Sequence, residues 1–531
     1  MPSGGGGQPK DSAPDKNEWS NWTTSDRAQV GASLSRADPE VVETAFRRIA
    51  ANFPAASWLP DVHGVADDPW NTARASLPFD PPLDEDVADY VAASVPVHLA
   101  DAWTYFGQAM HAVASGAVDV AQHLLYYSEL RAMNALLFRH GVLLMGERNF
   151  VLTSSGVEKI PFPKGAGRIE RNSHQGIWVL FTEWASSPRG AGFCGDVVNF
   201  AGQTLGTWAT ERPKPVELTG AMGALLKEWG VDIQRFSSDR AVRNNSSYTP
   251  TRLRPSPTTV SPAYVSDLLD QVWRLVAPTD GVAFQQLDPF IARIAFDSFT
   301  QAEHDDAAAA EDAAAVSDPS ATLPAEQSEA DGDGDGDGDG DGDGDGDGDE
   351  TRITGSYVPS DQTPTEFWVE RVLGRSPGQF VTEFIDDQTA HPTPTVIEDA
   401  SLNLAGTSAG RIFNGMVGRA LILLRFATGA TRDLIAAAGY STSDVDFWIR
   451  DMLQLHGIRI PDSQDYRDLW FDIEDAVADL EDMRSESDAD DANLSVLIDE
   501  RAKQVQILAG FERVPAWAAA PVADDDEERV A

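Results

Sequence analysis

The sequence predicts a mostly α-helical protein made of two helical domains, and three observations favour that fold class. Apolar residues recur every three or four positions over long stretches, as they do on the buried face of a helix. Gly, Ser, Thr and Asp separate these stretches at positions typical of helix ends and starts. An Asp-Gly repeat at 331–348 divides the helical part of the 531-residue chain. We therefore predict an all-α protein whose two domains are joined by a disordered acidic Asp-Gly linker.

The N-terminal region predicts a disordered arm followed by a helix. Residues 1–35 are rich in Gly, Ser, Asp and Pro and contain few apolar side chains, which is typical of disorder. A helix is expected after Asp38, where an N-cap residue, a Pro at the first helical position and an early Glu begin the stretch PEVVETAFRRIAANF. A Pro-rich loop is expected to follow.

A helical domain over 36–301 is expected to contain a few short strands. Two long helices are predicted between Asp84 and His140, with a break near Ser115 and Gly116 and a C-cap at Gly141. The stretch 142–215 mixes β-like runs with Gly and Pro, which predicts short strands among loops and short helices. The β-like runs are 142–145, 150–152 and 177–181, and further helices are expected at 217–229, 262–277 and 288–300.

The second half predicts an acidic linker, a second helical domain and a tail. Residues 302–352 are rich in Ala, Asp and Gly, and their like charges and low hydrophobicity predict an extended linker. A helical domain is expected over 353–513, and residues 514–531 are expected to form an acidic tail. Helices are predicted at 364–374, 410–428, 431–438, 444–456, 463–485 and 492–510, separated at Gly429, Gly439 and Gly457.

The charge of the chain predicts a salt-adapted, cytoplasmic protein. The formal net charge is -45, and nineteen acidic residues with no Lys or Arg between 302 and 350 leave about -26 for the rest. An Asp-rich surface with only seven Lys residues keeps a protein hydrated where salt screens charge within about 3 Å. Such acidity disfavours unspecific binding to nucleic acid at low salt. We expect no membrane segment, because no run of about 18 apolar residues occurs.

The sequence motifs of several kinds of functional site are absent. Cys194 is the single cysteine, which excludes an internal disulfide and a Cys-based zinc cluster. The chain has no phosphate-binding glycine loop, no GxSxG elbow and no HExxH motif. An EF-hand pattern ending at Glu350 follows from the Asp-Gly repeat itself, and its flanks do not resemble EF-hand helices. We therefore expect no cofactor and no metal site.

The remaining candidate residues centre on arginine and histidine. A basic cluster at Arg235, Arg240 and Arg243 precedes Asn244 and Tyr248. The sequence also contains the helical stretch HLLYYSELRAMNALLFRHGV at 123–142 and the pattern Ser173, His174, Trp178. Together these features resemble uncharacterised bacterial helical proteins that are similar to the YaaC-like and HEPN-like families, whose members include RNases of phage-defence systems.

The resemblance implies a metal-independent endoribonuclease or an inactive relative. The HEPN motif is an Arg, usually followed by a polar residue, with a His after four to six intervening positions. Arg243 and Asn244 match its beginning, but Tyr248 stands where the His belongs. The candidate catalytic set is Arg243, Asn244, Tyr248 and His174. The resemblance further implies RNA as a partner, protein partners in a defence or stress system, and a homodimer.

Other interpretations of the same residues stay open. Arg168 with His174, and Arg450 with His456, also match the Arg-to-His spacing. Arg450 and His456 are six residues apart on a predicted helix, so they project about 120° apart and need a partner helix to converge. The alternative function is a non-enzymatic scaffold or interaction protein of a halophile, in which these arginines form structural ion pairs. A structural protein of a halophile also fits the composition.

Overall fold

The computed structural model confirms a mostly helical protein. About 72% of the described residues are helical, and the strands form a three-stranded sheet and a two-stranded ladder. The sheet includes two of the predicted β-like runs. The structure describes residues 21–69, 85–145, 148–166, 173–200, 203–210, 242, 260–278, 283–292, 393–400, 409–460, 466, 468–486 and 502–520.

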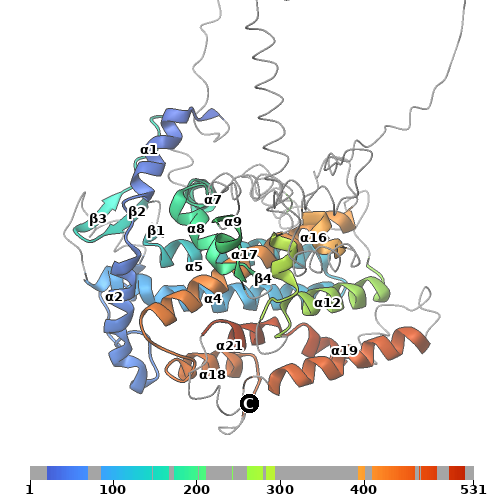
Figure 1. Cartoon of the computed structure of the whole chain (residues 1–531). Coiled ribbons are helices and arrows are strands. Elements are labelled where there is room, and N and C mark those ends of the chain that lie inside the picture. The colour runs from blue at the N-terminus through green and yellow to red at the C-terminus, as the bar shows by residue number, and fades with distance from the viewer. Residues whose placement is uncertain are drawn as a thin grey trace, which may run out of the picture.

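Three long helices form the centre of the molecule. α4 (Glu85–Ala114), α5 (Val118–Arg139) and α17 (Ala409–Ala437) pack against one another, with α17 coming from the part of the chain beyond the Asp-Gly repeat (Figure 1). The predicted break between the first two helices is confirmed, because Gly116 has a φ of 75°. Gly141, with a φ of 73°, ends α5 as predicted, since only glycine adopts this conformation without strain.

α17 contains the longest uninterrupted run of buried residues in the described structure. Every residue from 413 to 431 is buried, so the helix has no solvent-facing stripe over five turns. The predicted division into helices at 410–428 and 431–438 is wrong, because α17 continues through Gly429. A Cβ atom at Gly429 would lie 2.6 Å from the Val197 side chain. This glycine therefore allows α8 (Pro188–Val197) to pack closely and does not end the helix.

A buried ion pair attaches α17 to the first half of the chain. The Arg425 guanidinium donates from Nε and Nη2 to the two Asp288 carboxylate oxygens, each at 2.7 Å. The backbone N–H of Asn199 donates to the same carboxylate at 2.8 Å. The two side chains are 10% and 2% exposed. Burial raises the pKa of the Asp288 carboxyl, whereas the charge and hydrogen bonds of Arg425 lower it.

Two further contacts hold α17 against α4 and α5. The Trp103 indole of α4 donates to the Thr428 hydroxyl at 3.1 Å. On α5, the Arg139 guanidinium bonds both Glu43 and Asp433, at 2.7 and 2.6 Å. Glu43 belongs to α2 (Pro39–Ile49), so this arginine joins three helices. Thr428 and Asp433 of α17 are thus each paired with a group from another helix.

The C-terminal elements form a layer below the central helices (Figure 1). This layer contains α18 (Asp446–Leu455), α19 (Asp468–Glu486), η4 (Phe511–Arg513) and α21 (Val514–Ala518). Trp273 of α12 (Pro262–Val276) donates its indole N–H to the Leu508 carbonyl at 2.7 Å, and its ring stacks on Phe511 at 4.1 Å. The predicted acidic tail is wrong for residues 514–520, because all of them are buried in this layer.

The N-terminal helix was not expected from composition. α1 (Thr24–Leu34) begins with a reciprocal capping box between Thr23 and Asp26, which satisfies backbone donors at the helix start. Trp22 packs edge-on against Phe162 at 5.7 Å. The disordered arm predicted for 1–35 is therefore wrong for residues 21–35. The capping box and the buried side chains of Trp22, Val30 and Leu34 outweigh the polar composition there.

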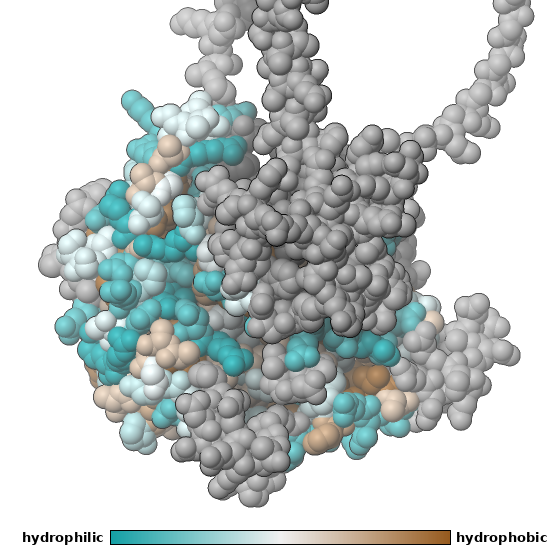
Figure 2. Space-filling view, in the orientation of Figure 1, coloured by the Kyte–Doolittle hydropathy of each residue, from teal (hydrophilic) through white to brown (hydrophobic). Residues whose placement is uncertain are grey.

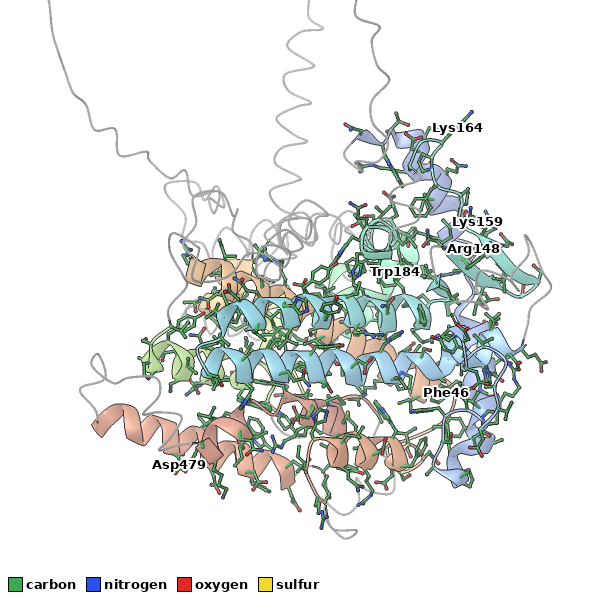
Figure 3. All side chains as sticks on the ribbon, turned by 180° about the vertical axis from the view of Figure 1, so that it is seen from behind. Phe46, Arg148, Lys159, Lys164, Trp184 and Asp479 are labelled. Atoms are coloured by element: carbon green, nitrogen blue, oxygen red, sulfur yellow. The ribbon has the colours of Figure 1, made fainter. Side chains whose placement is uncertain are left out.

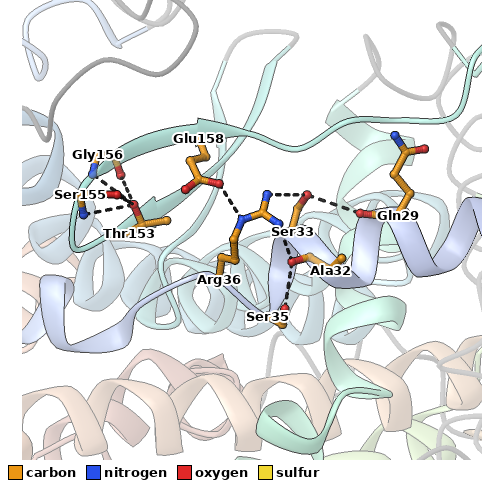
Figure 4. A network of polar contacts seen from close by, with 9 residues as sticks. All are labelled: Gln29, Ala32, Ser33, Ser35, Arg36, Thr153, Ser155, Gly156 and Glu158. Carbon is orange, nitrogen blue, oxygen red and sulfur yellow. Dashed lines mark hydrogen bonds and ion pairs between the residues drawn. The ribbon is translucent and has the colours of Figure 1, made fainter.

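Arg36 joins the end of α1 to the sheet. Its Nε donates to the Glu158 carboxylate at 2.7 Å, and its Nη1 donates to the Ala32 carbonyl at 3.0 Å (Figure 4). Its Nη2 also donates to the Ser33 hydroxyl at 3.3 Å. The side chain of Arg36 is 49% exposed, so we expect this ion pair to contribute little stability and mainly to fix the position of the helix.

Aromatic side chains join the N-terminal region to α18 and to Tyr440, which precedes it. The ring centroid of Phe53 in η2 (Ala50–Ala55) lies 5.7 Å from that of Tyr440 and 5.3 Å from that of Phe447. Trp58 lies 5.1 Å from Phe447 and 5.8 Å from Trp448. Since such ring pairs stabilise beyond the area they bury, this cluster is a second apolar connection between the two parts of the chain.

A small sheet and three short helices complete the upper part. β1 (Val142–Met145), β2 (Arg148–Thr153) and β3 (Gly156–Lys159) form an antiparallel meander. α7 (Ser173–Ala185) packs against β1, followed by α8 and α9 (Leu205–Thr210). The predicted strand at 177–181 is wrong, because this run belongs to α7. All five residues are buried, and a continuous apolar run does not distinguish a buried helix from a buried strand.

The two parts of the chain share one hydrophobic core. Buried side chains from Trp22 to Ala520 form one contiguous cluster, to which both predicted domains contribute. The described residues thus do not separate into two cores at the predicted boundary. The linker assigned to 302–352 lies outside the described residues and stays a prediction. Among the described helices, none is both long and apolar enough to cross a membrane.

The Arg425–Asp288 pair yields a test of how α17 is attached. Arg425→Met should lower the free energy of unfolding by about 3–5 kcal/mol, because it leaves a buried carboxylate without its partner. The double variant Arg425→Met/Asp288→Leu should lose less than the sum of the single losses. Arg274→Met, which removes an exposed pair with Asp270, should cost at most about 1 kcal/mol. Urea unfolding curves measure these values, and additive single losses would contradict a coupled pair.

Candidate functional site

Two of the stretches that carry the resemblance meet in the structure. The Tyr126 hydroxyl of α5 lies 3.0 Å from Nδ1 of His174 near the start of α7. The two ring centroids are 5.9 Å apart, and Tyr127 meets the same imidazole edge-on at 6.3 Å. The ring centroids of His123 and Tyr127 are 5.0 Å apart, and those of Tyr105 of α4 and Tyr127 are 5.7 Å apart. These five residues are the His174 cluster.

The cluster arises because α7 packs against α5. Tyr126 meets His174 near the start of α7, and the His140 ring, which follows α5, meets Trp184 near the end of α7 at 4.6 Å. α7 also contacts α1 and β1. The position of His174 is therefore fixed by a packed helix and not by a loop.

The hydrogen bond to Tyr126 restricts the chemistry of His174. If Nδ1–H donates to the tyrosine oxygen, Nε2 becomes the acceptor and can take a proton from a substrate. If the tyrosine hydroxyl donates to Nδ1, Nε2 carries the hydrogen and acts as a donor. Tyr126 is fully buried, whereas His174 is half-buried. The arrangement thus presents a part-exposed imidazole whose orientation a buried hydroxyl controls.

The sequence did not identify Tyr105 and His123 as members of this cluster. His123 and Tyr127 are four residues apart on α5, which places them on one helix face, and this spacing could have indicated a cluster. Tyr105 comes from a neighbouring helix, and no local pattern shows its approach. Both side chains are half-buried and aromatic, so they could contact a planar ring of a ligand.

Arg243, Asn244 and Tyr248, the other predicted site residues, lie outside the described residues, as does Arg168. Their approach to His174 therefore stays a prediction. The one predicted member that the structure places is His174.

Arg450 and His456 do not form a common site. Arg450 Nε donates to Asp446 one turn earlier at 2.6 Å, and its Nη1 donates to the Ile460 carbonyl at 3.2 Å. His456 follows the last residue of α18, and its Nε2 lies 3.1 Å from the Thr104 hydroxyl of α4. The arginine thus stabilises its own helix and the following loop, while the histidine attaches α18 to the central layer.

A second Arg–His contact, not anticipated from sequence, joins α4 and α5. Arg131 Nη1 lies 3.1 Å from Nδ1 of His98, and Arg131 Nε lies 3.5 Å from the Asp101 carboxylate. Burial, together with the charge of Arg131, lowers the pKa of His98 to about 3. Such an imidazole is neutral at pH 7 and a weak proton acceptor, so we interpret this group as structural.

His140 is a buried histidine at the other end of α5. It packs between Trp184 and Phe193, with both ring centroids at 4.6 Å, and is 4% exposed. In the described structure, neither of its ring nitrogens has a hydrogen-bond partner. Burial, followed by the charges of Arg139 and Arg189, lowers its pKa well below the ordinary value. The folded protein therefore holds it in the neutral form.

Groups that could hold a metal ion do not occur among the described residues. No three His, Cys, Asp or Glu side chains converge there. Cys194 is buried in α8, and burial raises the pKa of its thiol, which makes it a poor nucleophile.

No protein-family model matches the chain, and neither a curated protein nor a solved structure matches it. The resemblance to HEPN-like proteins stays an expectation from sequence.

The burial of His140 in its neutral form predicts that the protein loses stability in mild acid. An unfolded His binds a proton near pH 6.5, while the folded His140 resists protonation, so the unfolded state binds more protons below that pH. The free energy of unfolding should fall as the pH decreases, by at most about 2 kcal/mol from this residue between pH 6.5 and 5. His140→Phe keeps the ring packing and should weaken this dependence, as measured by urea unfolding at several pH values.

The matched control is His111→Phe, since His111 is an exposed residue of α4. It should leave the pH dependence unchanged. An unchanged slope in His140→Phe would show that other groups cause the acid sensitivity.

Proposed function

We propose that the chain is a component of a defence or stress system and acts as a divergent, metal-independent endoribonuclease of HEPN-like type. The observation that supports this proposal is the contact of Tyr126 and Tyr127 of α5 with His174 of α7. Both helices carry stretches on which the resemblance is based, and Tyr126 and His174 lie 48 residues apart along the chain. Their hydrogen bond is the arrangement that a shared site would require.

His174 is the proton acceptor in this proposal. Its Nε2 takes the proton of an RNA 2′-hydroxyl while Nδ1–H donates to Tyr126. The 2′ oxygen attacks the adjacent phosphorus, the bond from phosphorus to the 5′ oxygen breaks, and a solvent proton goes to that oxygen. The products are a 2′,3′-cyclic phosphate and a 5′-hydroxyl. The reaction needs no metal ion, which agrees with the residue types of the candidate set.

Arg243, with Asn244 and Tyr248, supplies the second part of the proposed site. An Arg stabilises negative charge that develops on the phosphoryl oxygens in the transition state. Tyr248 can donate a hydrogen bond to the phosphate, but a phenol of ordinary pKa, near 10, is a poor base at neutral pH. His174 therefore takes the role that the motif histidine has in HEPN-like proteins, and Tyr248 serves as an anion ligand.

Cleavage of RNA in the presence of EDTA tests this assignment. The full-length protein should cut single-stranded RNA at high salt, and His174→Ala should slow cleavage by about 100-fold or more, as expected for loss of a general base. Arg243→Ala should have a similar effect, because it removes transition-state stabilisation. Tyr126→Phe should reduce the rate less, since it leaves the imidazole in place and removes only its hydroxyl partner.

His456→Ala is the matched control, because His456 also bonds a hydroxyl of another helix but lies far from His174 in sequence. Its rate should equal that of the unchanged protein. Activity that survives His174→Ala and disappears in His456→Ala would place the catalytic centre near α18 instead.

A second function is a non-enzymatic scaffold, and the described arginines favour it. Arg139, Arg411, Arg425 and Arg450 each bond a carboxylate, so they stabilise contacts between or within helices. On this interpretation His174 and Tyr126 are also a structural pair. The absence of cleavage by the intact protein, with its natural partners present, would support the scaffold.

A further inference from the structure

Two half-buried tyrosine rings lie against each other on neighbouring helices. The ring centroids of Tyr105 on α4 and Tyr127 on α5 are 5.7 Å apart, and the ring planes are inclined by 36°. Both side chains are part-exposed, so each ring keeps some of its surface in contact with solvent. A planar group can extend the two rings as a third one, because aromatic rings prefer offset stacking. Tyr105 and Tyr127 are called the tyrosine pair.

Apolar side chains border the tyrosine pair. Val120, Leu124 and Tyr127 follow one another on α5 at spacings of four and three residues, which places them on one helix face. Val120 is 52% exposed, and Leu124 is half-buried. Figure 3, the view from behind, shows α4 and α5 side by side in front of the other described elements. On the opposite side, Figure 2 shows a mainly hydrophilic described surface over α1, α2 and the sheet.

The tyrosine pair lies next to the candidate catalytic histidine. The ring centroids of Tyr127 and His174 are 6.3 Å apart, and the ring planes are nearly perpendicular, at 87°. Among the described residues, neither hydroxyl of the pair has a hydrogen-bond partner, so both can bond the polar edge of a ligand. A planar group that stacks on the pair is therefore held close to the group on which His174 acts.

We propose that the tyrosine pair stacks on the bases of single-stranded RNA. This inference rests on the proposed function and adds the surface that holds the substrate beside His174. Every nucleobase has an aromatic face, so stacking on protein rings binds single strands with little dependence on their sequence. Duplex RNA does not offer these faces, because its bases are stacked on one another.

The charge of the chain favours stacking over contacts with the phosphate backbone. The formal net charge of -45 repels a polyanion, and salt near 1 M screens this repulsion to within about 3 Å. Proteins that hold phosphates with cations lose affinity as the salt concentration rises. Stacking between neutral rings needs no opposite charge, so for the tyrosine pair we expect affinity that does not fall with salt.

Fluorescence anisotropy with a labelled oligodeoxyuridylate tests the proposal. This probe lacks the 2′-hydroxyl, so the proposed cleavage mechanism cannot cut it, and its bases can still stack. Tyr127→Leu and Tyr105→Leu should each weaken binding to the full-length protein by about 5- to 100-fold, the effect of losing one stacked ring. Tyr127→Phe should bind within about twofold of the parent, because it keeps the ring.

Tyr440→Leu is the matched control, since Tyr440 is a half-buried tyrosine that packs on Phe53 elsewhere in the structure. It should bind the probe as tightly as the parent. An oligonucleotide of the same length without bases should bind far more weakly than the probe. Affinity for the probe should stay level or increase when the KCl concentration rises about tenfold. Thermal melting of each variant confirms that it is folded.

Several outcomes would overturn the stacking surface. These are no binding of the probe by the parent, equal binding of the base-free oligonucleotide, and equal losses in Tyr127→Leu and Tyr440→Leu. A fall in affinity with salt would indicate contacts with phosphates and would also overturn it.

The two proposals can fail separately. Binding that needs the tyrosine pair, by a protein that cuts no RNA, would refute the nuclease and retain the stacking surface. Cleavage that is unaffected by Tyr127→Leu would refute the stacking surface and retain the nuclease.

Discussion

The burial of α17 from residue 413 to residue 431 is the constraint on which the rest of the structure depends. A helix that is apolar on every side must be surrounded by other elements, and a single hydrophobic face of one partner does not suffice. Residues 413–431 obtain that cover from α4, α5, α8 and α16 (Thr395–Ala400). The same helix carries Arg425, whose buried charge requires the Asp288 carboxylate from the other half of the chain. Neither half can therefore complete its core alone.

This constraint also determines where the candidate site forms. α5 packs on both α17 and α7, so the buried part of α17 supports the helix whose tyrosines contact α7. Tyr126 is fully buried, and its hydroxyl holds the half-buried His174 at the edge of that packing. A loss of α17 contacts should consequently affect the His174 cluster, although no residue of the cluster belongs to α17.

Local signals predicted the parts of the structure that are encoded locally. The cap at Asp38, the break at Gly116 and the C-cap at Gly141 were found because each depends on a few neighbouring residues. Gly429 misled the prediction, since its role is close contact with Val197, which is more than two hundred positions away. The predictions of a strand at 177–181 and of disorder over the whole N-terminal arm were wrong for a related reason. Tertiary burial there outweighs local pattern and composition.

In the candidate site, too, the sequence predicted what depends on neighbouring residues and did not predict contacts between helices. His174 was identified from a short pattern, but its partner Tyr126, the neighbouring Tyr105 and the Arg131–His98 contact depend on how helices pack. Arg450 and His456 matched a sequence motif and yet bind different partners, because six residues along a helix turn two side chains apart. Spacing alone could not distinguish a helix-stabilising ion pair from a catalytic pair.

The shared core is tested most directly by cutting the chain between its two parts. A protease site placed in the Asp-Gly repeat allows cleavage of the folded protein, and size-exclusion chromatography under native conditions then reports whether the fragments stay together. We predict that both fragments elute together at the position of the intact protein and separate only in denaturant, because α17 remains buried against α4 and α5. Two fragments that separate under native conditions and each keep a cooperative melting transition would contradict a single core.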